Sequence, residues 1–384
     1  MKRLMLAGAL STMSFFGCAV EETDPPNNPP DGIDQALLAE YRAALPSMGQ
    51  LGAKAPEGSV ASILATGDPA VYPTGSYDIA TGINGAVTGI IQVLDDVTSI
   101  EPTIFNSETN EFFWGPFANE DGIGYVAAYI REGRPGADFQ FEYALLRGID
   151  NDVAKLTPVI WGGATPDPEN EDHGAGVTLW DFEANRAFEE EHNPDFDNLE
   201  LDRGRFVALY AAGVDENDPA AEGVYVLATF RDFVSVDDPD AAPANLDYFY
   251  GHYENGIKVD FLDWEANIDV TEPADGLIED VGVRMAFLNE GAGRAEADAV
   301  GGSLEEGQQL FAVECWNAAI EQSYISFDIQ QGGESVAGGS EGQIADCGLF
   351  TASLDDLGVP SLDDVDPGLR AILDEVARNG VVAE

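Results

Sequence analysis

The sequence predicts a mainly β fold, with α+β character at its margins: a large antiparallel, curved sheet or barrel on which N-terminal helices and a C-terminal helix pack. Three observations predict it. Beyond Pro102, short runs of alternating apolar and polar residues replace the helical period found earlier in the chain. Turn-rich stretches, not long helices, separate these runs, so parallel crossovers are not available. Part of the pattern also occurs twice, which indicates two diverged meander units.

The repeat is clearest in segments 177–185 and 259–267, which share an Asp-aromatic-Glu-Ala-Asn pattern. Segments 125–131 and 225–231, upstream of the two copies, also correspond to each other. A sheet of eight or more strands tends to curl and protects its edges better than a single unit would. We therefore expect a β domain over residues 102–350 that contains two units, 122–213 and 223–290, and strands at 125–131, 138–147, 177–183, 206–211, 224–233, 246–253, 257–265 and 281–288.

The first residues have the pattern of a targeting peptide. Lys2 and Arg3 precede a short apolar run over residues 4–16, and Gly17 stands before Cys18. The apolar run is too short to cross a bilayer, which takes about 20 residues. At these residues the chain resembles a bacterial lipoprotein precursor. The resemblance implies that residues 1–17 are a cleaved signal peptide and that Cys18 is lipidated; a secreted protein with an incidental cysteine is the alternative.

The lipoprotein resemblance also implies a place for the protein in the cell. The mature chain would be exported and anchored to a bacterial membrane through its N-terminal lipid. Ala19 follows the cysteine where an inner-membrane retention signal would have aspartate, so the outer membrane is expected. Residues 18–31 hold four prolines and form a stiff tether that keeps a folded body away from the membrane.

The other two cysteines are expected to pair. The chain has three cysteines, and lipidation of Cys18 would leave Cys315 and Cys347 as an even pair. Exported compartments permit a disulfide, and closing this loop would contribute about 3 to 4 kcal/mol. A structural zinc site is the less favoured alternative, because it needs four ligands and no histidine lies near either cysteine in sequence.

Helices are expected at both ends of the body. In segment 32–101, one helix would begin at Asp31 or Asp34 and end at Pro46. A short helix would follow at 59–65, and a glycine-containing one over 81–97. In the C-terminal segment 351–384, Asp366 would cap a last helix whose apolar stripe packs on the body, after a glycine-rich loop that leads to Cys347.

The charge of the chain excludes some partners and favours others. Its 71 acidic and 17 basic residues give a formal net charge of −54. This field repels nucleic acid and anionic surfaces, attracts cations and keeps the protein soluble, so no nucleic-acid partner is expected. No cofactor or metal site is assigned. A bound calcium remains open because oxygen ligands gather in two loops, with Asp195, Asp197 and Asp202 in one and Asp215, Asn217 and Asp218 in the other.

The repeated pattern contains two pairs of carboxylates that are candidates for catalysis. Asp181 and Glu183, like Asp263 and Glu265, are two residues apart, so on a strand each pair would share a face with about 6.6 Å between them. That spacing is compatible with glycoside hydrolysis by paired carboxylates. The opposite face carries apolar residues, however, which would point the carboxylates at solvent. A solvated surface is therefore the favoured interpretation, and the chain is expected not to be an enzyme.

The function that follows is a lipid-anchored, non-catalytic envelope lipoprotein. The body also resembles acidic, β-rich bacterial lipoproteins, a resemblance that implies no functional residues. One interpretation is that the curved sheet, covered by the 81–97 helix, binds an apolar ligand. The alternative is a structural or interaction protein of the envelope, with a packed core and envelope protein partners; a hydrolase is third. The residues expected to line the apolar site are Phe139, Phe141, Tyr143, Tyr248 and Tyr250.

Overall fold

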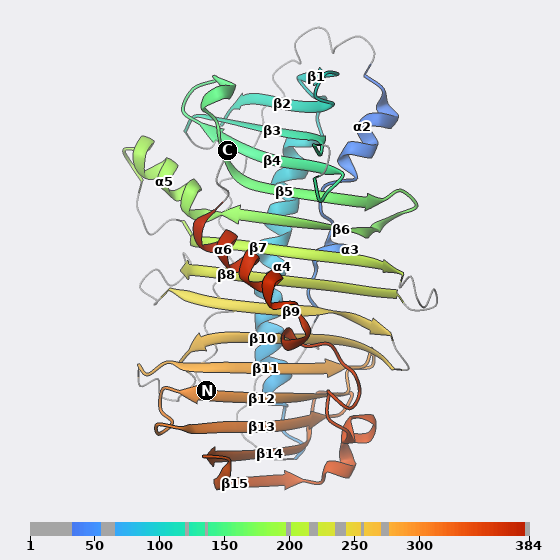
Figure 1. Cartoon of the computed structure of the whole chain (residues 1–384), viewed down its shortest axis with the longest axis vertical. Helices are drawn as coiled ribbons and strands as arrows, with labels where there is room; N and C mark the ends of the chain where they lie inside the picture. The colour runs from blue at the N-terminus through green and yellow to red at the C-terminus, as the bar shows by residue number, and fades with distance from the viewer. Residues whose placement is uncertain are drawn as a thin grey trace.

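The protein folds around one antiparallel sheet of fifteen strands, each hydrogen-bonded to its neighbours in chain order (Figure 1). This computed structural model describes residues 33–54, 66–119, 123–134, 137–196, 201–214, 222–234, 243–254, 257–269 and 276–380. The sheet is curved and does not close, so the expected antiparallel curved sheet is confirmed and the barrel is not formed. Its strands are β1 Ile104–Asn106, β2 Glu111–Ala118, β3 Tyr125–Glu132, β4 Phe141–Gly148, β5 Thr157–Asp167, β6 Asn170–Asp181, β7 Arg203–Val214, β8 Glu222–Val234, β9 Ala244–Glu254, β10 Lys258–Ile268, β11 Glu279–Phe287, β12 Gly293–Gly301, β13 Gln308–Trp316, β14 Gln322–Gln331 and β15 Glu334–Gly342.

Helices lie at both ends of the described chain and once in its middle. Asp34 caps α2 with its side chain, as the sequence predicted, whereas the helix expected at 59–65 lies outside the described residues. No described helix, α4 included, is both long and apolar enough to cross a membrane. The helices are α2 Gln35–Arg42, α3 Met48–Leu51, α4 Val71–Thr98, α5 Phe182–His192 and α6 Pro367–Asn379, with short 3-10 turns at Val153–Lys155, Ile344–Thr351 and Leu362–Asp364.

Helix α4 covers one face of the sheet, which we call the back face. Its 28 residues give a length of about 42 Å. Strands lie about 4.8 Å apart, so a helix of this length crosses roughly nine of them. Figure 1 shows it running lengthwise behind the sheet, across the strands. Residues such as Leu262 and Trp264 of β10 are buried beneath it, and Trp264 Nε1 donates a hydrogen bond to Ser76 Oγ of α4 (3.1 Å).

A buried carboxylate holds the first turn of α4 to the sheet. Glu314 of β13 is fully buried and accepts hydrogen bonds from the backbone N–H groups of Val71 (2.9 Å) and Tyr72 (2.8 Å). No side chain of the preceding residue, Ala70, can cap this helix, so Glu314 supplies the missing acceptor from a distant strand. Burial nevertheless dominates and raises the pKa of Glu314 to about 7.

The opposite, front face is covered in parts by the C-terminal segment. Helix α6 lies across this face in Figure 1 and packs Leu373 and Ala377 against β6 to β8. Farther along the sheet, the predicted disulfide between Cys315 and Cys347 is present, with the two Cα atoms 5.5 Å apart. It joins β13 to a small apolar cluster beneath residues 347–359. The front face therefore has two separate covers with sheet exposed between them.

Two local expectations were wrong. The stretch between Cys315 and Cys347 was expected to be a glycine-rich loop, but it contains β14 and β15. The strand expected at 177–183 ends at Asp181, because the Asp181 side chain accepts the Ala184 N–H (2.9 Å) and starts α5. The two copies of the repeated pattern therefore differ, since the second remains in strand β10 throughout.

The buried Glu314 carboxyl makes stability depend on pH. Its pKa is raised from 4.5 to about 7, so its contribution to folding is fully present below pH 4.5 and is lost as the pH rises through 7. Glu314→Gln keeps an acceptor but cannot ionise. We expect the free energy of unfolding of this variant, measured with urea, to rise relative to that of wild type by on the order of 1–3 kcal/mol as the pH goes from 5 to 8.

Glu314→Ala is the control for the hydrogen bonds themselves. It leaves the Val71 and Tyr72 N–H groups without their acceptor and should cost about 1–2 kcal/mol at both pH values. If Glu314→Gln kept the pH dependence of wild type, the buried carboxyl would not be its source.

Candidate functional site

The gap between the two front covers is a polar groove of about 720 Å³. Strands β8 to β13 contribute to its floor, and its walls come from the C-terminal segment. Eight carboxylates and three guanidinium groups line it, together with one exposed aromatic ring, Phe311. The charged residues are Arg231, Asp247, Asp263, Glu265, Asp280, Arg284, Glu296, Asp298, Asp355, Asp363 and Arg378.

The strand register places four groove residues in one row. Glu265 of β10 is paired with Gly282 of β11, Gly282 with Asp298 of β12, and Asp298 with Phe311 of β13. Paired residues point to the same side of the sheet, so these four positions form one row across the front face. Gly282 contributes no side chain to that row. The Asp298 carboxylate lies over this glycine, with its Oδ1 2.8 Å from where a Cβ would stand.

Asp263 is the most deeply buried carboxylate of the groove. Its residue is 7% exposed, and its Oδ2 accepts the backbone N–H of Leu362 (2.7 Å). Burial raises the pKa of Asp263 to about 7, an effect that the Leu362 N–H and the neighbouring Arg284 oppose and that Glu265 and Asp363 increase. The expectation that this carboxylate points at solvent was wrong, because the C-terminal segment covers it.

Repulsion among the carboxylates extends to Asp298. Partial burial raises the pKa of Asp298, a hydrogen bond with Gln309 opposes the rise, and the charges of Glu265 and Asp363 add to it. The same two charges act on Asp263. Glu265 and Asp363 therefore raise the pKa of both Asp263 and Asp298, although Glu265 itself is paired with Arg370 (2.7 Å).

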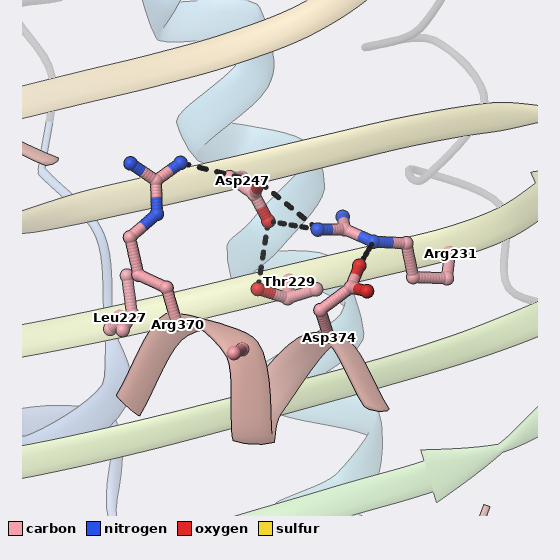
Figure 2. Close-up of a pocket in the computed structure, with 7 residues that line it drawn as sticks. Leu227, Thr229, Arg231, Asp247, Arg370 and Asp374 are labelled. Carbon is pink, nitrogen blue, oxygen red and sulfur yellow. Dashed lines mark hydrogen bonds and ion pairs between the residues drawn. The ribbon is translucent and has the colours of Figure 1, made fainter. Parts of the chain in front are cut away.

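A smaller pocket of about 260 Å³ adjoins the groove, because Arg231 and Asp247 line both (Figure 2). Figure 2 shows Arg231 between two carboxylates: its Nη2 lies 2.8 Å from Asp247 and its Nε 2.5 Å from Asp374 of α6. Thr229 donates a hydrogen bond to Asp247 (2.9 Å), and Arg370 of α6 approaches the same carboxylate at 3.7 Å. These ion pairs hold α6 at the edge of the groove.

The site residues predicted from the sequence lie on both faces of the sheet. Phe141, Tyr143, Tyr248 and Tyr250 are each at most 1% exposed and pack in the core of the back face, away from both described pockets. Phe139 is partly exposed and its ring lies against Gly163. The apolar residues proposed to line one site are therefore core residues, apart from Phe139.

The two carboxylate pairs have different outcomes. Asp263 and Glu265 share the front face and both line the groove, as their spacing predicted. Asp181 and Glu183 do not share a strand face: Asp181 caps α5 and forms an ion pair with Arg205 (2.8 Å), and Glu183 lies within α5. Helix capping at Asp181 overrode the alternating pattern of the first copy.

Comparison of the chain with protein-family models, with curated proteins and with solved structures finds no match. Among the described residues, no group of three His, Cys, Asp or Glu side chains could hold a metal ion. Cys18 and four of the six loop residues considered for calcium, Asp197, Asp215, Asn217 and Asp218, lie outside the described ranges.

Gly282, Asp298 and Phe311 are site residues that the sequence did not reveal. They lie 16 and 13 residues apart on three strands, and only the register brings them into one row. Asp298 occupies a strand of small residues, Gly293–Gly301, whose alternation is weak. The one usable signal was the carboxylate pair at Asp263 and Glu265.

Arg231→Met should loosen α6 from the sheet. The substitution leaves Asp247 and Asp374 without their shared guanidinium, which should cost about 1–3 kcal/mol because the pair is partly buried. Hydrogen–deuterium exchange should then accelerate in Pro367–Asn379 and not in α4.

Lys155→Met is the matched control for removal of a cation. Lys155 is 61% exposed and pairs only on the surface with Asp150 and Asp152, so its loss should leave α6 protected. Equal exchange in both variants would show that the Arg231 ion pairs do not hold the helix.

Proposed function

We propose that this protein is a lipid-anchored, non-catalytic binding protein of a bacterial envelope, and that its front groove holds a small polar ligand. The observation that carries the proposal is the 720 Å³ groove between the two covers of the front face. Such a volume is in the range of small-molecule sites. The floor comes from a continuous sheet, so the lining side chains are held on rigid elements.

The polarity of the lining argues for a polar ligand. An apolar ligand on the back face would have to displace α4 from residues such as Tyr248 and Tyr250, which are buried beneath it. Tyr250 also donates a hydrogen bond to the Leu51 carbonyl (2.7 Å), and this contact would be lost. The front groove needs no such rearrangement, because it is already open.

The N-terminal pattern supports the anchored location. The basic start, the short apolar run and Cys18 suit lipid attachment, and the proline-rich residues that follow suit a spacer between membrane and body. An anchored protein of this kind would present its groove to molecules in the surrounding compartment. The same pattern is also compatible with an interaction role in the envelope.

A second candidate, hydrolysis by paired carboxylates, is favoured by one observation. Asp263 has a pKa raised to about 7 and lies in the groove with Glu265, two residues along the same strand. A carboxyl that keeps its proton near neutral pH can act as a general acid. Glu265, however, is engaged by Arg370 (2.7 Å), and Asp263 by the Leu362 N–H, so both have structural partners.

Lipid attachment is tested by labelling cells that express the full chain with radioactive palmitate. We expect wild type to incorporate label and Cys18→Ser to incorporate none, because the thiol is the attachment point that the lipoprotein pattern implies. The matched control is Ser14→Ala, which leaves the thiol in place and should be labelled. Label in Cys18→Ser would contradict the anchor.

Ligand binding is tested by native mass spectrometry of the chain purified gently from its envelope. We expect a small polar adduct on wild type that is lost in Gly282→Val, whose side chain would enter the groove floor and displace the Asp298 carboxylate. Gly75→Ala in α4 is the control, because an added Cβ there meets nothing within 4 Å.

Three results would contradict binding in the groove. They are no adduct at all, an adduct that Gly282→Val retains, and a lipid-sized apolar adduct. A cleaved product that disappears in Asp263→Asn would instead favour the second candidate, hydrolysis.

A further inference from the structure

We propose that the outer edge of β15 is a docking site for an extended, basic segment of another protein, which pairs with β15 as an additional strand of the sheet. This inference goes beyond the proposed function, because it concerns the end of the sheet and not the groove. Four features carry it: an open strand edge, the small side chains of that strand, an apolar stripe that α4 does not cover, and the charge of the region.

The two edges of the sheet differ in length. At one end, β1 has three residues, and such a short edge strand offers little backbone for pairing. At the other end, β15 has nine residues, and Figure 1 shows it as the outermost strand. Within the described part of the chain, only β14 pairs with the backbone of β15. The outer side of β15 therefore presents N–H and C=O groups that another strand can bind.

The residues of β15 leave this edge accessible. All nine are exposed, and the strand contains no proline or lysine, two residues that commonly block sheet edges. After one register shift, six consecutive pairs with β14 run regularly from Ala337 to Gly342. Residues 338–340 within this run are Gly-Gly-Ser. A partner backbone can approach such small residues closely.

An apolar stripe lies beside the edge on the back face. Ile325, Phe327 and Ile329 alternate along β14, and they share the face of Glu314, which is paired with Ile325. Helix α4 begins at Glu314 and runs toward the opposite end of the sheet, so β14 and β15 lie beyond its first turn (Figure 1). Phe327 is 46% exposed, and its ring lies 3.2 Å from where a Cβ on Gly339 would stand. The ring therefore reaches the edge strand.

Exposed apolar side chains concentrate at this end of the sheet. Of the twelve large apolar side chains that are exposed in the described chain, five lie between Phe311 and Leu349. The segment that leads into α4 meets the ends of the last two strands, where Gly67 donates its N–H to the Gln322 carbonyl (2.8 Å) and Thr66 donates to Glu341 (3.2 Å). An apolar stripe beside an open edge suits a partner strand, because backbone pairing gives affinity and alternate side chains give specificity.

The charge of this region favours a basic partner. Residues 295–369 contain fifteen Asp or Glu residues and no Lys, Arg or His. On β15 itself, Glu334 and Glu341 flank the Phe327 ring on the back face, and they are separated by about 20 Å along the strand. Basic side chains at both ends of a partner strand would lie opposite these two carboxylates.

A second copy of this chain would fit the edge less well. It would place another strand with two glutamates and no cation against the first, and like charges on paired strands are destabilising. Each copy also carries a net charge of −54. The partner that fits is an extended segment with Lys or Arg at its ends and apolar side chains between them on the same face.

Fluorescence anisotropy with the labelled peptide Lys-Thr-Val-Thr-Val-Thr-Lys tests the inference on the purified protein in 0.15 M NaCl. On a strand, this peptide places both lysines and both valines on one face. We expect saturable binding that is at least about tenfold tighter than that of Lys-Thr-Val-Pro-Val-Thr-Lys, which keeps the charges but has a proline that impairs strand pairing. Equal binding of the two peptides would overturn the inference, because it would show charge attraction without pairing.

Variants of the edge strand locate the site. The double variant Glu334→Gln, Glu341→Gln should weaken peptide binding about fivefold, because it removes both charges that the lysines meet. The matched control is Glu108→Gln with Glu169→Gln, which removes two exposed carboxylates from turns outside β15 and should change affinity less than twofold. Unchanged thermal unfolding would show that both double variants fold normally. Equal weakening by the two double variants would contradict docking at β15.

Hydrogen–deuterium exchange with and without the peptide reports the pairing itself. We expect slower exchange in Glu334–Gly342 and no change in β1, because only the edge of β15 would gain hydrogen bonds. Exchange that does not slow in β15, or slows to the same extent over the whole chain, would contradict the inference. Light scattering should show a monomer; a dimer that excludes the peptide from β15 would instead assign the edge to a second copy and overturn the proposed partner.

Discussion

The packing of α4 along the back of the sheet is the interaction on which the rest of the structure depends. A meander of fifteen strands that does not close exposes two faces, and one long helix covers most of one of them. The helix and strands bury a continuous apolar core that includes Leu262, Trp264 and Tyr248. Glu314 fixes where the helix begins, because its carboxylate receives the first free N–H groups of α4. The part of the back face beneath α4 is therefore a packed core.

The front face of the sheet is organised by the C-terminal segment. The C-terminal segment covers it in two parts, around α6 and around the Cys315–Cys347 disulfide, and charged residues rather than apolar ones lie between them. Burial of Asp263 and the mutual repulsion of its neighbours cost stability that a packed apolar surface would not cost. Such a cost, at an open groove, is typical of functional sites.

The sequence contained enough to predict the fold but little of the groove. Alternating residues without intervening helices predicted antiparallel pairing, and the lone cysteine pair predicted the disulfide. Strands β1, β2, β5 and β12 to β15 were not predicted individually. In β12 and β15, Ala, Gly and Ser dominate and leave little contrast between the two faces. Helix α5 was missed because Asp181 can either continue a strand or cap a helix, and its interaction with the Ala184 N–H decides this only in the folded chain. The row of Glu265, Gly282, Asp298 and Phe311 across the groove floor depends on the register of four strands. No local sequence pattern reveals that register.

Carboxyl-group footprinting of the gently purified chain, with its native adduct and after the adduct is removed, tests most directly that the front groove, and not the acidic surface at large, is the binding site. Carbodiimide labelling reports the accessibility of each Asp and Glu separately, so one experiment compares the groove with the rest of the chain. The proposed site predicts protection of Asp298, Glu265 and Asp363, with Glu334 and Glu341 of β15 unchanged. Protection spread evenly over the acidic residues, or confined to residues outside the groove, would contradict it.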